Sequence, residues 1–179
     1  MNLPSLADRI ARIELLVLDV DGVLTDGRVT YTDDGREIKS FHVRDGAGLR
    51  YWIDAGKQAA IISGRNSPAV TRRAEELGIA RIVQGAGAKL PAFRKLLAEM
   101  NLDPSSVCVI GDDLPDLPLL RNAGFGIAVA DACPELRAVA DHVTKQMGGR
   151  GAVREAIEML LQGQGHWQPQ LQRLHAERL

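Results

Sequence analysis

The sequence of 179 residues predicts an α/β fold, in which a doubly wound, mostly parallel sheet carries helices on both faces and a β-hairpin projects from it. Three observations predict this fold. Short apolar runs alternate with longer amphipathic segments almost from end to end. The runs lack the alternation of apolar and polar residues that marks a half-exposed strand, as is typical of strands covered on both faces. One segment, residues 27–43, interrupts the pattern and resembles a hairpin instead.

Six apolar runs are expected to form the strands of the sheet, and several of them are rich in Val and Ile. In chain order they cover residues 15–20, 59–62, 82–83, 107–110, 127–129 and, more weakly, 142–144. The segments between them carry helix signals. Asp45 is in position to cap a helix that runs toward Ala55, and Ser67-Pro68 begins a helix that Leu77-Gly78 closes. Further helices are expected over residues 89–100, 115–122, 134–140 and 151–161.

The hairpin segment is expected to form an insertion in a single domain. Its strands would cover residues 28–32 and 37–43 on either side of Asp33-Asp34-Gly35, because Asp-Gly is a favourable hairpin turn. An isolated two-stranded hairpin is marginally stable in water, so this one is expected to pack on another subunit. The domain is expected to span residues 1–162, with a polar and loosely ordered tail over residues 163–179.

Composition and charge exclude several classes of protein. With 45% hydrophobic and 25% charged residues, the chain is typical of one soluble globular domain. Lys and Arg number 22 against 23 for Asp and Glu, so no broad positive field is available to bind nucleic acid. No apolar stretch approaches the roughly 20 residues that span a bilayer, and no secretory signal is visible, so no membrane association is expected. Two cysteines do not indicate a disulfide framework, and a cytoplasmic location is expected.

Acidic residues follow two of the predicted strands. Asp19 and Asp21 come directly after the first strand, and carboxylates two residues apart on an extended segment point to the same side. Charges this close need a cation or a proton between them, although Asp-Gly alone can be no more than a turn. Asp112, Asp113 and Asp116 follow the fourth strand, where helix capping is the alternative for the last two. Two acidic clusters at one sheet edge indicate a hard divalent cation, with Mg²⁺ favoured.

Groups suited to an anion follow the other strands. Ser63 and Arg65 come after the second strand, and Lys89 begins a helix after the glycine-rich residues 85–88. A hydroxyl, backbone N–H groups and an ammonium together form a cradle for phosphate. Taken singly, Ser63 could be a turn residue and Lys89 a solvated helix charge. In this order at the strand ends, they indicate a phosphate site.

These four elements resemble the four motifs of the haloacid dehalogenase superfamily of phosphohydrolases, in the same order from Asp19 to Asp116. Further segments resemble the family of 3-deoxy-D-manno-octulosonate 8-phosphate phosphatases, over nearly the whole chain up to about Leu161: residues 19–27 (DVDGVLTDG), 43–46, 111–114 and 148–155. These features are shared in part with phosphatases of nine-carbon acids such as N-acylneuraminate 9-phosphate. The resemblance implies hydrolysis of an acidic sugar phosphate in lipopolysaccharide precursor biosynthesis, and a non-catalytic sugar-phosphate-binding module is the alternative from another class.

The resemblance also implies a mechanism. Asp19 would be the nucleophile that forms an aspartyl-phosphate, and Asp21 would protonate the leaving oxygen and then take a proton from water. The superfamily holds Mg²⁺ with groups that correspond here to the Asp19 carboxylate, the Asp21 backbone carbonyl and the Asp112 carboxylate. Ser63 and Lys89 would hold the phosphate oxygens, and Asp113 would orient Lys89 or a metal-bound water.

The remaining cations are expected at the acidic end of the substrate, because arginine grips a carboxylate by a two-pronged contact. A surface salt bridge is the alternative for each arginine. Many family members have Asn at the position of His42, so that contact is expected to differ here. Arg150, in the glycine-rich loop over residues 148–151, is expected to sense an anion. The resemblance implies substrate contacts for Asp21, His42, Val43, Arg44, Asp45, Gly46, Arg50, Arg65, Arg73 and Lys89.

The chain is too short for a separate cap domain. Only 44 positions separate Asp19 from Ser63, and most of them are the hairpin. Larger members of the superfamily insert a cap there, or between later motifs, to exclude water. The resemblance instead implies a homotetramer whose hairpins pack into a shared barrel, with a neighbouring subunit helping to cover each site.

Overall fold

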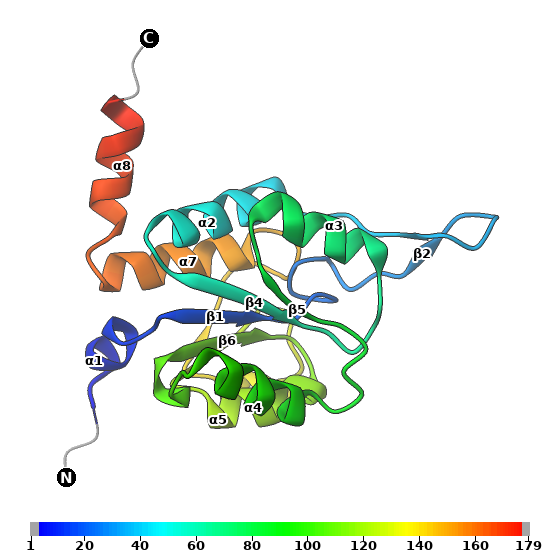
Figure 1. Ribbon diagram of the computed structural model, residues 1–179, viewed down its shortest axis with the longest axis horizontal. Coiled ribbons are helices and arrows are strands. Elements are labelled where there is room, and N and C mark those ends of the chain that lie inside the picture. Colours follow the sequence, from blue (N-terminus) through cyan, green and yellow to red (C-terminus); the bar gives the residue numbers. More distant parts are fainter. Residues whose placement is uncertain (1–3, 177–179) are drawn as a thin grey trace.

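A six-stranded parallel sheet forms the centre of the molecule in the computed structural model, which describes residues 4–176 (Figure 1). The strand order is β5-β4-β1-β6-β7-β8. The bounds are β1 Leu15–Leu18, β4 Gln58–Ile62, β5 Arg81–Val83, β6 Val107–Gly111, β7 Phe125–Ala128 and β8 His142–Val143. The predicted α/β fold with a parallel sheet and a separate hairpin is confirmed.

Helices cover both faces of this sheet. α2 (Val43–Asp54), α3 (Pro68–Leu77) and α7 (Ala152–Gly163) lie on one face, while α4 (Lys89–Met100) and α5 (Leu117–Asn122) lie on the other (Figure 1). Further short helical elements are α1 Leu6–Ala11, η1 Pro104–Ser106, η2 Leu114–Asp116 and α6 Pro134–Arg137. None of the helices within residues 4–176 is both long and apolar enough to cross a membrane.

The central strands are buried on both faces, which explains their continuous apolar sequence. Every residue of β1 and of β6 is buried, and β1 pairs in parallel with both β4 and β6. The chain runs outward from β1 through β4 to β5 and then returns to β6 on the other side of β1. This reversal of direction between β1 and β6 creates a crevice at their carboxyl ends, where open α/β sheets bind ligands.

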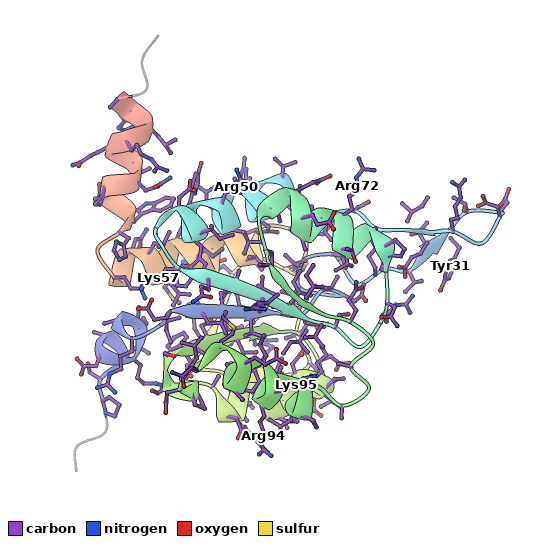
Figure 2. The ribbon with its side chains drawn as sticks, viewed as in Figure 1. Tyr31, Arg50, Lys57, Arg72, Arg94 and Lys95 are labelled. Carbon is purple, nitrogen blue, oxygen red and sulfur yellow. The ribbon has the colours of Figure 1, made fainter. Side chains whose placement is uncertain are left out.

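The hairpin is present but its strands are shorter than predicted. β2 (Thr30–Tyr31) pairs with β3 (Glu37–Ile38) in antiparallel register around the predicted turn. The second strand cannot reach Val43 because that residue already begins α2. The hairpin projects from the body of the molecule, with Tyr31 on its outer part (Figure 2). Its apolar side chains are exposed within one chain: Val29 by 46%, Tyr31 by 60% and Ile38 by 48%.

Asp45 does not cap its own helix, contrary to the sequence prediction. Since α2 begins at Val43, Asp45 lies in its first turn and is 1% exposed. Its carboxylate accepts hydrogen bonds from the backbone N–H of Gly151, at 3.2 Å, and of Arg154, at 2.8 Å. Asp45 therefore caps the beginning of α7, a helix more than 100 positions away in the sequence.

The expectation of a loosely ordered tail is wrong for residues up to 176, and residues 177–179 lie outside the described part of the chain. α8 (Trp167–Ala176) follows α7 and stands beside the body of the molecule (Figure 1). Its first residue, Trp167, is only 8% exposed. The Trp167 ring meets Tyr51 edge to face at 6.1 Å and lies 5.4 Å from the Arg154 guanidinium. This contact anchors the helix to α2 and α7.

Candidate functional site

Four of the predicted residues meet where β1, β4 and β6 end. Asp19 follows β1 directly, Ser63 follows β4, Asp112 follows β6, and Lys89 is the first residue of α4. Because these strands are parallel, their carboxyl ends lie at one edge of the sheet, and the four residues line one cavity of about 310 Å³. We call it the carboxylate cavity. Its other lining residues are Asp21, Gly64, Arg65, Ala86, Gly87, Asp113, Pro115 and Asp116.

Lys89 is buried between two carboxylates. Its Nζ lies 2.8 Å from Oδ1 of Asp19 and 2.7 Å from Oδ1 of Asp116, and its side chain is 5% exposed. Burial by itself would lower the pKa of Lys89, but the charges of Asp116 and Asp19 outweigh burial and raise that pKa. The ammonium therefore stays charged beside Asp19, where it can offset the negative charge of a phosphate.

Asp116 reaches Lys89 because η2 turns the chain back after β6. Its second oxygen accepts a hydrogen bond from the backbone N–H of Asp112 at 3.2 Å. A Cβ at Gly111 would lie 2.5 Å from the Cβ of Asp116, so this close approach requires glycine at position 111. Of the two roles expected for Asp113, the orientation of Lys89 is performed by Asp116 instead.

Three carboxylates gather in the cavity. One oxygen from each of Asp19, Asp112 and Asp116 lies within 4.8 Å of the other two. Burial, together with the charge of Asp116, raises the pKa of Asp19 to about 6. Burial and the charges of Asp19 and Asp116 raise the pKa of Asp112 to about 8. Lys89 supplies one positive charge against three negative ones, so the fully ionised cluster favours a further cation.

The donor set suits a hard divalent cation. Carboxylate oxygens are the ligands that Mg²⁺ prefers, and a backbone carbonyl can join them. The loop after Asp21 passes close to Asp112, since a Cβ at Gly22 would lie 2.0 Å from Oδ2 of Asp112. Gly22 also has a φ of +90°, a backbone conformation that favours glycine. The loop backbone thus lies against the carboxylate cluster, as a carbonyl ligand would require.

The carboxylate of Asp21 faces cations and is not a member of the cluster. Its Oδ1 forms an ion pair with Nζ of Lys39, and its Oδ2 lies 3.6 Å from Nε of Arg65. Lys39 was not among the site residues predicted from the sequence. The sequence signal for Lys39 was the alternation of side chains along β3 and the residue after it, which places Glu37 and Lys39 on one face. That alternation does not reveal that the shared face turns toward Asp21.

Ser63 and the following loop form the opposite wall of the cavity. Ser63 is 2% exposed, and its Oγ accepts a hydrogen bond from the backbone N–H of Arg65 at 3.3 Å. The backbone N–H of Ala86 donates to the carbonyl of Ser63 at 3.0 Å, which joins this loop to the glycine-rich segment before α4. The hydroxyl, the loop and Lys89 therefore surround one space, as a phosphate cradle requires.

The other residues expected to contact substrate separate into distinct groups. Arg65 lines the carboxylate cavity, whereas Arg50 and Arg73 both contact Glu76 of α3, at 3.3 Å and 3.2 Å. Arg50 lies along the outer side of α2 (Figure 2). Val43 is 80% exposed. A Cβ at Gly46 would lie 2.2 Å from Nη2 of Arg73, so Arg73 of α3 packs against the backbone of α2 at Gly46.

A second cavity of about 380 Å³ lies between the beginnings of α2 and α7. Three of the residues expected to contact substrate line it: His42, Arg44 and Arg150. Arg150 also lies 3.7 Å from Asp26, and the loop before it is tied down because the N–H of Gly149 donates to the Val23 carbonyl at 2.8 Å. The full lining is His42, Arg44, Lys145, Gln146, Arg150, Gly151, Arg154, Glu155 and Glu158. These residues form a cavity separate from that of Asp19 within one chain.

Comparisons with known proteins show which families and structures this chain is similar to. The haloacid dehalogenase-like hydrolase family matches residues 79–157. The 3-deoxy-D-manno-octulosonate 8-phosphate phosphatase KdsC of Escherichia coli strain K12 is 47% identical over 165 residues, covering 90% of this chain and 88% of that protein.

Two solved structures are also similar. The 3-deoxy-D-manno-octulosonate 8-phosphate phosphatase of Moraxella catarrhalis, in complex with magnesium, phosphate and KDO, has a TM-score of 0.92 at 43% identity, covering 94% of this chain and 97% of that one. The cobalt-bound phosphatase of Haemophilus influenzae has a TM-score of 0.86 at 42% identity, covering 89% of this chain and 93% of that one.

Proposed function

Because the chain belongs to the family of 3-deoxy-D-manno-octulosonate 8-phosphate phosphatases, within the haloacid dehalogenase-like hydrolases, we propose that it hydrolyses this sugar phosphate to the free acid and phosphate. One observation carries the proposal most directly: the buried Lys89 ammonium lies 2.8 Å from Asp19, beside the carboxylates of Asp112 and Asp116. An ionised carboxylate next to a fixed cation and a cation site can attack an anionic phosphate ester.

Asp19 is the nucleophile of the proposed reaction. One of its oxygens forms a bond to phosphorus while the bond between phosphorus and the sugar oxygen breaks. The sugar oxygen takes a proton from Asp21 as it leaves, which gives the free sugar acid and an aspartyl-phosphate. Water then attacks phosphorus and returns a proton to Asp21. Inorganic phosphate leaves, and the Asp19 carboxylate is restored.

Lys89 and Ser63 bind the phosphate through this sequence. The Lys89 ammonium offsets negative charge on the transferring group, and its ion pair with Asp116, at 2.7 Å, keeps it in place. The Ser63 hydroxyl, at the end of β4, is in position to donate to another phosphate oxygen. Both side chains are buried before substrate arrives, so little ordering is required at the moment of reaction.

The carboxylates of Asp19 and Asp112 and the backbone carbonyl of Asp21 would hold Mg²⁺. When bound, the metal reduces the repulsion between the Asp19 carboxylate and the phosphate and helps to align them. The raised pKa of Asp112, about 8, supports this assignment, because a buried carboxyl that resists ionisation alone is stabilised as a carboxylate by a cation.

The acidic end of the substrate is proposed to meet cations from a neighbouring subunit. Arg65 lines the carboxylate cavity of its own chain, while His42, Arg44 and Arg150 line the second cavity, so one chain does not assemble the whole predicted set. The exposed apolar side chains of the hairpin support association into a homotetramer. A nine-carbon acid phosphate is the alternative substrate, because the same phosphate chemistry would serve it.

A phosphate-release assay with Asp19→Asn tests the reaction. The parent protein with Mg²⁺ should release phosphate faster from the eight-carbon acid phosphate than from a nine-carbon acid phosphate or a simple phosphomonoester. Asp19→Asn should reduce release by at least about 10³-fold, because the nucleophile is lost, while its sedimentation should still report the parent's tetramer. The matched control is Asp103→Asn, at an exposed cap of η1. Undiminished turnover by Asp19→Asn would refute the nucleophile, and equal turnover of all the esters would refute the substrate.

A further inference from the structure

A lysine on the hairpin arm contacts the proposed proton donor. The Lys39 side chain is 1% exposed, and its Nζ forms an ion pair with Oδ1 of Asp21. The same ammonium lies 3.6 Å from Oε1 of Glu37. A buried ammonium is costly to desolvate unless carboxylates face it at close range. The burial of Lys39 is therefore coupled to the position of Asp21.

Arg65 completes a ring of four charges. Its Nη2 lies 2.5 Å from Oε1 of Glu37, and its Nε lies 3.6 Å from Oδ2 of Asp21. Cations and carboxylates alternate around the ring, from Lys39 to Asp21 to Arg65 to Glu37. Each oxygen of Asp21 thus faces a different cation, which restricts rotation of the carboxylate about its side-chain bonds.

The ring approaches the carboxylate cavity from the hairpin side. Glu37 and Lys39 are two residues apart on an extended arm, so they share a face, while Ile38 between them is 48% exposed. Asp21 and Arg65 line the cavity, whereas Glu37 and Lys39 are absent from its described lining. Lys39 therefore contacts Asp21 without lining the cavity, and the space inside the cavity remains available for substrate.

We propose that Lys39 is a positioning residue that holds the Asp21 carboxyl toward the leaving oxygen of the substrate. The inference rests on the proposed function, in which Asp21 protonates that oxygen. Without Lys39, the ion pair with Arg65 at 3.6 Å is the one that Asp21 keeps among residues 4–176. A displaced proton donor slows the departure of a basic leaving group, but it has little effect on a leaving group that departs readily as an anion.

The test compares two aryl phosphates on the full-length, Mg²⁺-loaded protein. Phenyl phosphate and p-nitrophenyl phosphate are similar in shape, but the phenyl leaving oxygen is much more basic. For Lys39→Met, kcat/KM for phenyl phosphate should fall about tenfold or more, while that for p-nitrophenyl phosphate should fall less than about threefold. Lys39→Arg should show the same selectivity with a smaller loss, and it provides the measurement if Lys39→Met does not fold.

Three outcomes would overturn the role of Lys39: equal losses on both esters, no loss on either, or a loss confined to p-nitrophenyl phosphate. The matched control is Arg36→Met, which removes a cation from the same hairpin where it is paired with Asp34, and it should change neither ester. Asp21→Asn separates this inference from the function on which it rests. If Asp21→Asn shows no selectivity, the proposed role of Asp21 fails; if only Lys39→Met lacks selectivity, the positioning role fails.

Discussion

Raising the pH from 5 to 8 without Mg²⁺ should destabilise the folded protein. Burial raises the pKa of Asp19 to about 6 and that of Asp112 to about 8, both above the ordinary value of 3.8. A carboxyl whose pKa is higher in the folded state binds more protons there than in the unfolded chain. Its stabilising effect is complete below about pH 4 and is lost as the pH rises through the folded-state pKa, so stability should fall across this range.

The size of the fall follows from these values. Where the folded state binds one proton more than the unfolded state, the free energy of unfolding falls by about 1.4 kcal/mol for each unit by which the pH rises. Between pH 5 and pH 8, Asp112 accounts for nearly three such units and Asp19 for about one. Because the two carboxyls face each other across one site, their losses overlap, and we expect a total of about 3 to 5 kcal/mol. This is a large part of the stability of an ordinary domain.

Equilibrium urea unfolding at fixed protomer concentration measures this effect. The fluorescence of Trp52 and Trp167, which are 0% and 8% exposed, should report unfolding of the body and of α8. Each pH is measured with a chelator and with excess Mg²⁺, and the free energy of unfolding is extrapolated to water. Mg²⁺ binds the ionised carboxylates of the folded state, so it should reduce or reverse the fall toward pH 8.

Two variants locate the effect. Asp112→Asn removes the carboxyl with the higher pKa, so its chelated form should lose most of the slope between pH 6 and pH 8. Asp103→Asn is the matched control, because hydrogen bonds to Ser105 lower the pKa of this exposed carboxyl and its contribution changes only in acid. Parallel pH profiles with and without Mg²⁺, or an unchanged slope in Asp112→Asn, would refute the reasoning about the cluster.

Two further substitutions test the contacts that connect α2 with α7 and the loop at residue 148 with the site. Asp45→Ala leaves the N–H groups of Gly151 and Arg154 without their buried acceptor. The free energy of unfolding measured in urea should therefore fall by about 2 to 4 kcal/mol. A fall of less than about 1 kcal/mol would show that Asp45 does not cap α7. In Gly148→Ala the new Cβ would lie 1.6 Å from the Gly22 carbonyl oxygen, so the loop beside Asp112 must move. Phosphate release should therefore fall more than about tenfold. A variant as active as the parent protein would contradict this packing.

The sequence predicted helices well where residues at the two ends of the helix marked its boundaries. α3 covers Pro68–Leu77 as expected, because Pro68 favours the first turn and Gly78 adopts a left-handed conformation, with a φ of +78°, just after the last. The capping prediction was wrong at Asp45, whose carboxylate oxygens accept hydrogen bonds from N–H groups of α7 rather than of its own helix. α8 was not predicted either, because a short polar helix depends on the docking of Trp167 against Tyr51 and Arg154.

The sequence by itself determined the parallel sheet and the chemistry at its carboxyl edge. Uninterrupted apolar strands require cover on both faces, and parallel strands bring Asp19, Ser63 and Asp112 to one side whatever the details of packing. Only the tertiary structure decided which charges pair within that edge. Asp116 rather than Asp113 holds Lys89, and Lys39 reaches Asp21, because such pairs depend on how loops distant in sequence approach one another in space. Residue order along the chain carries no direct information about those distances.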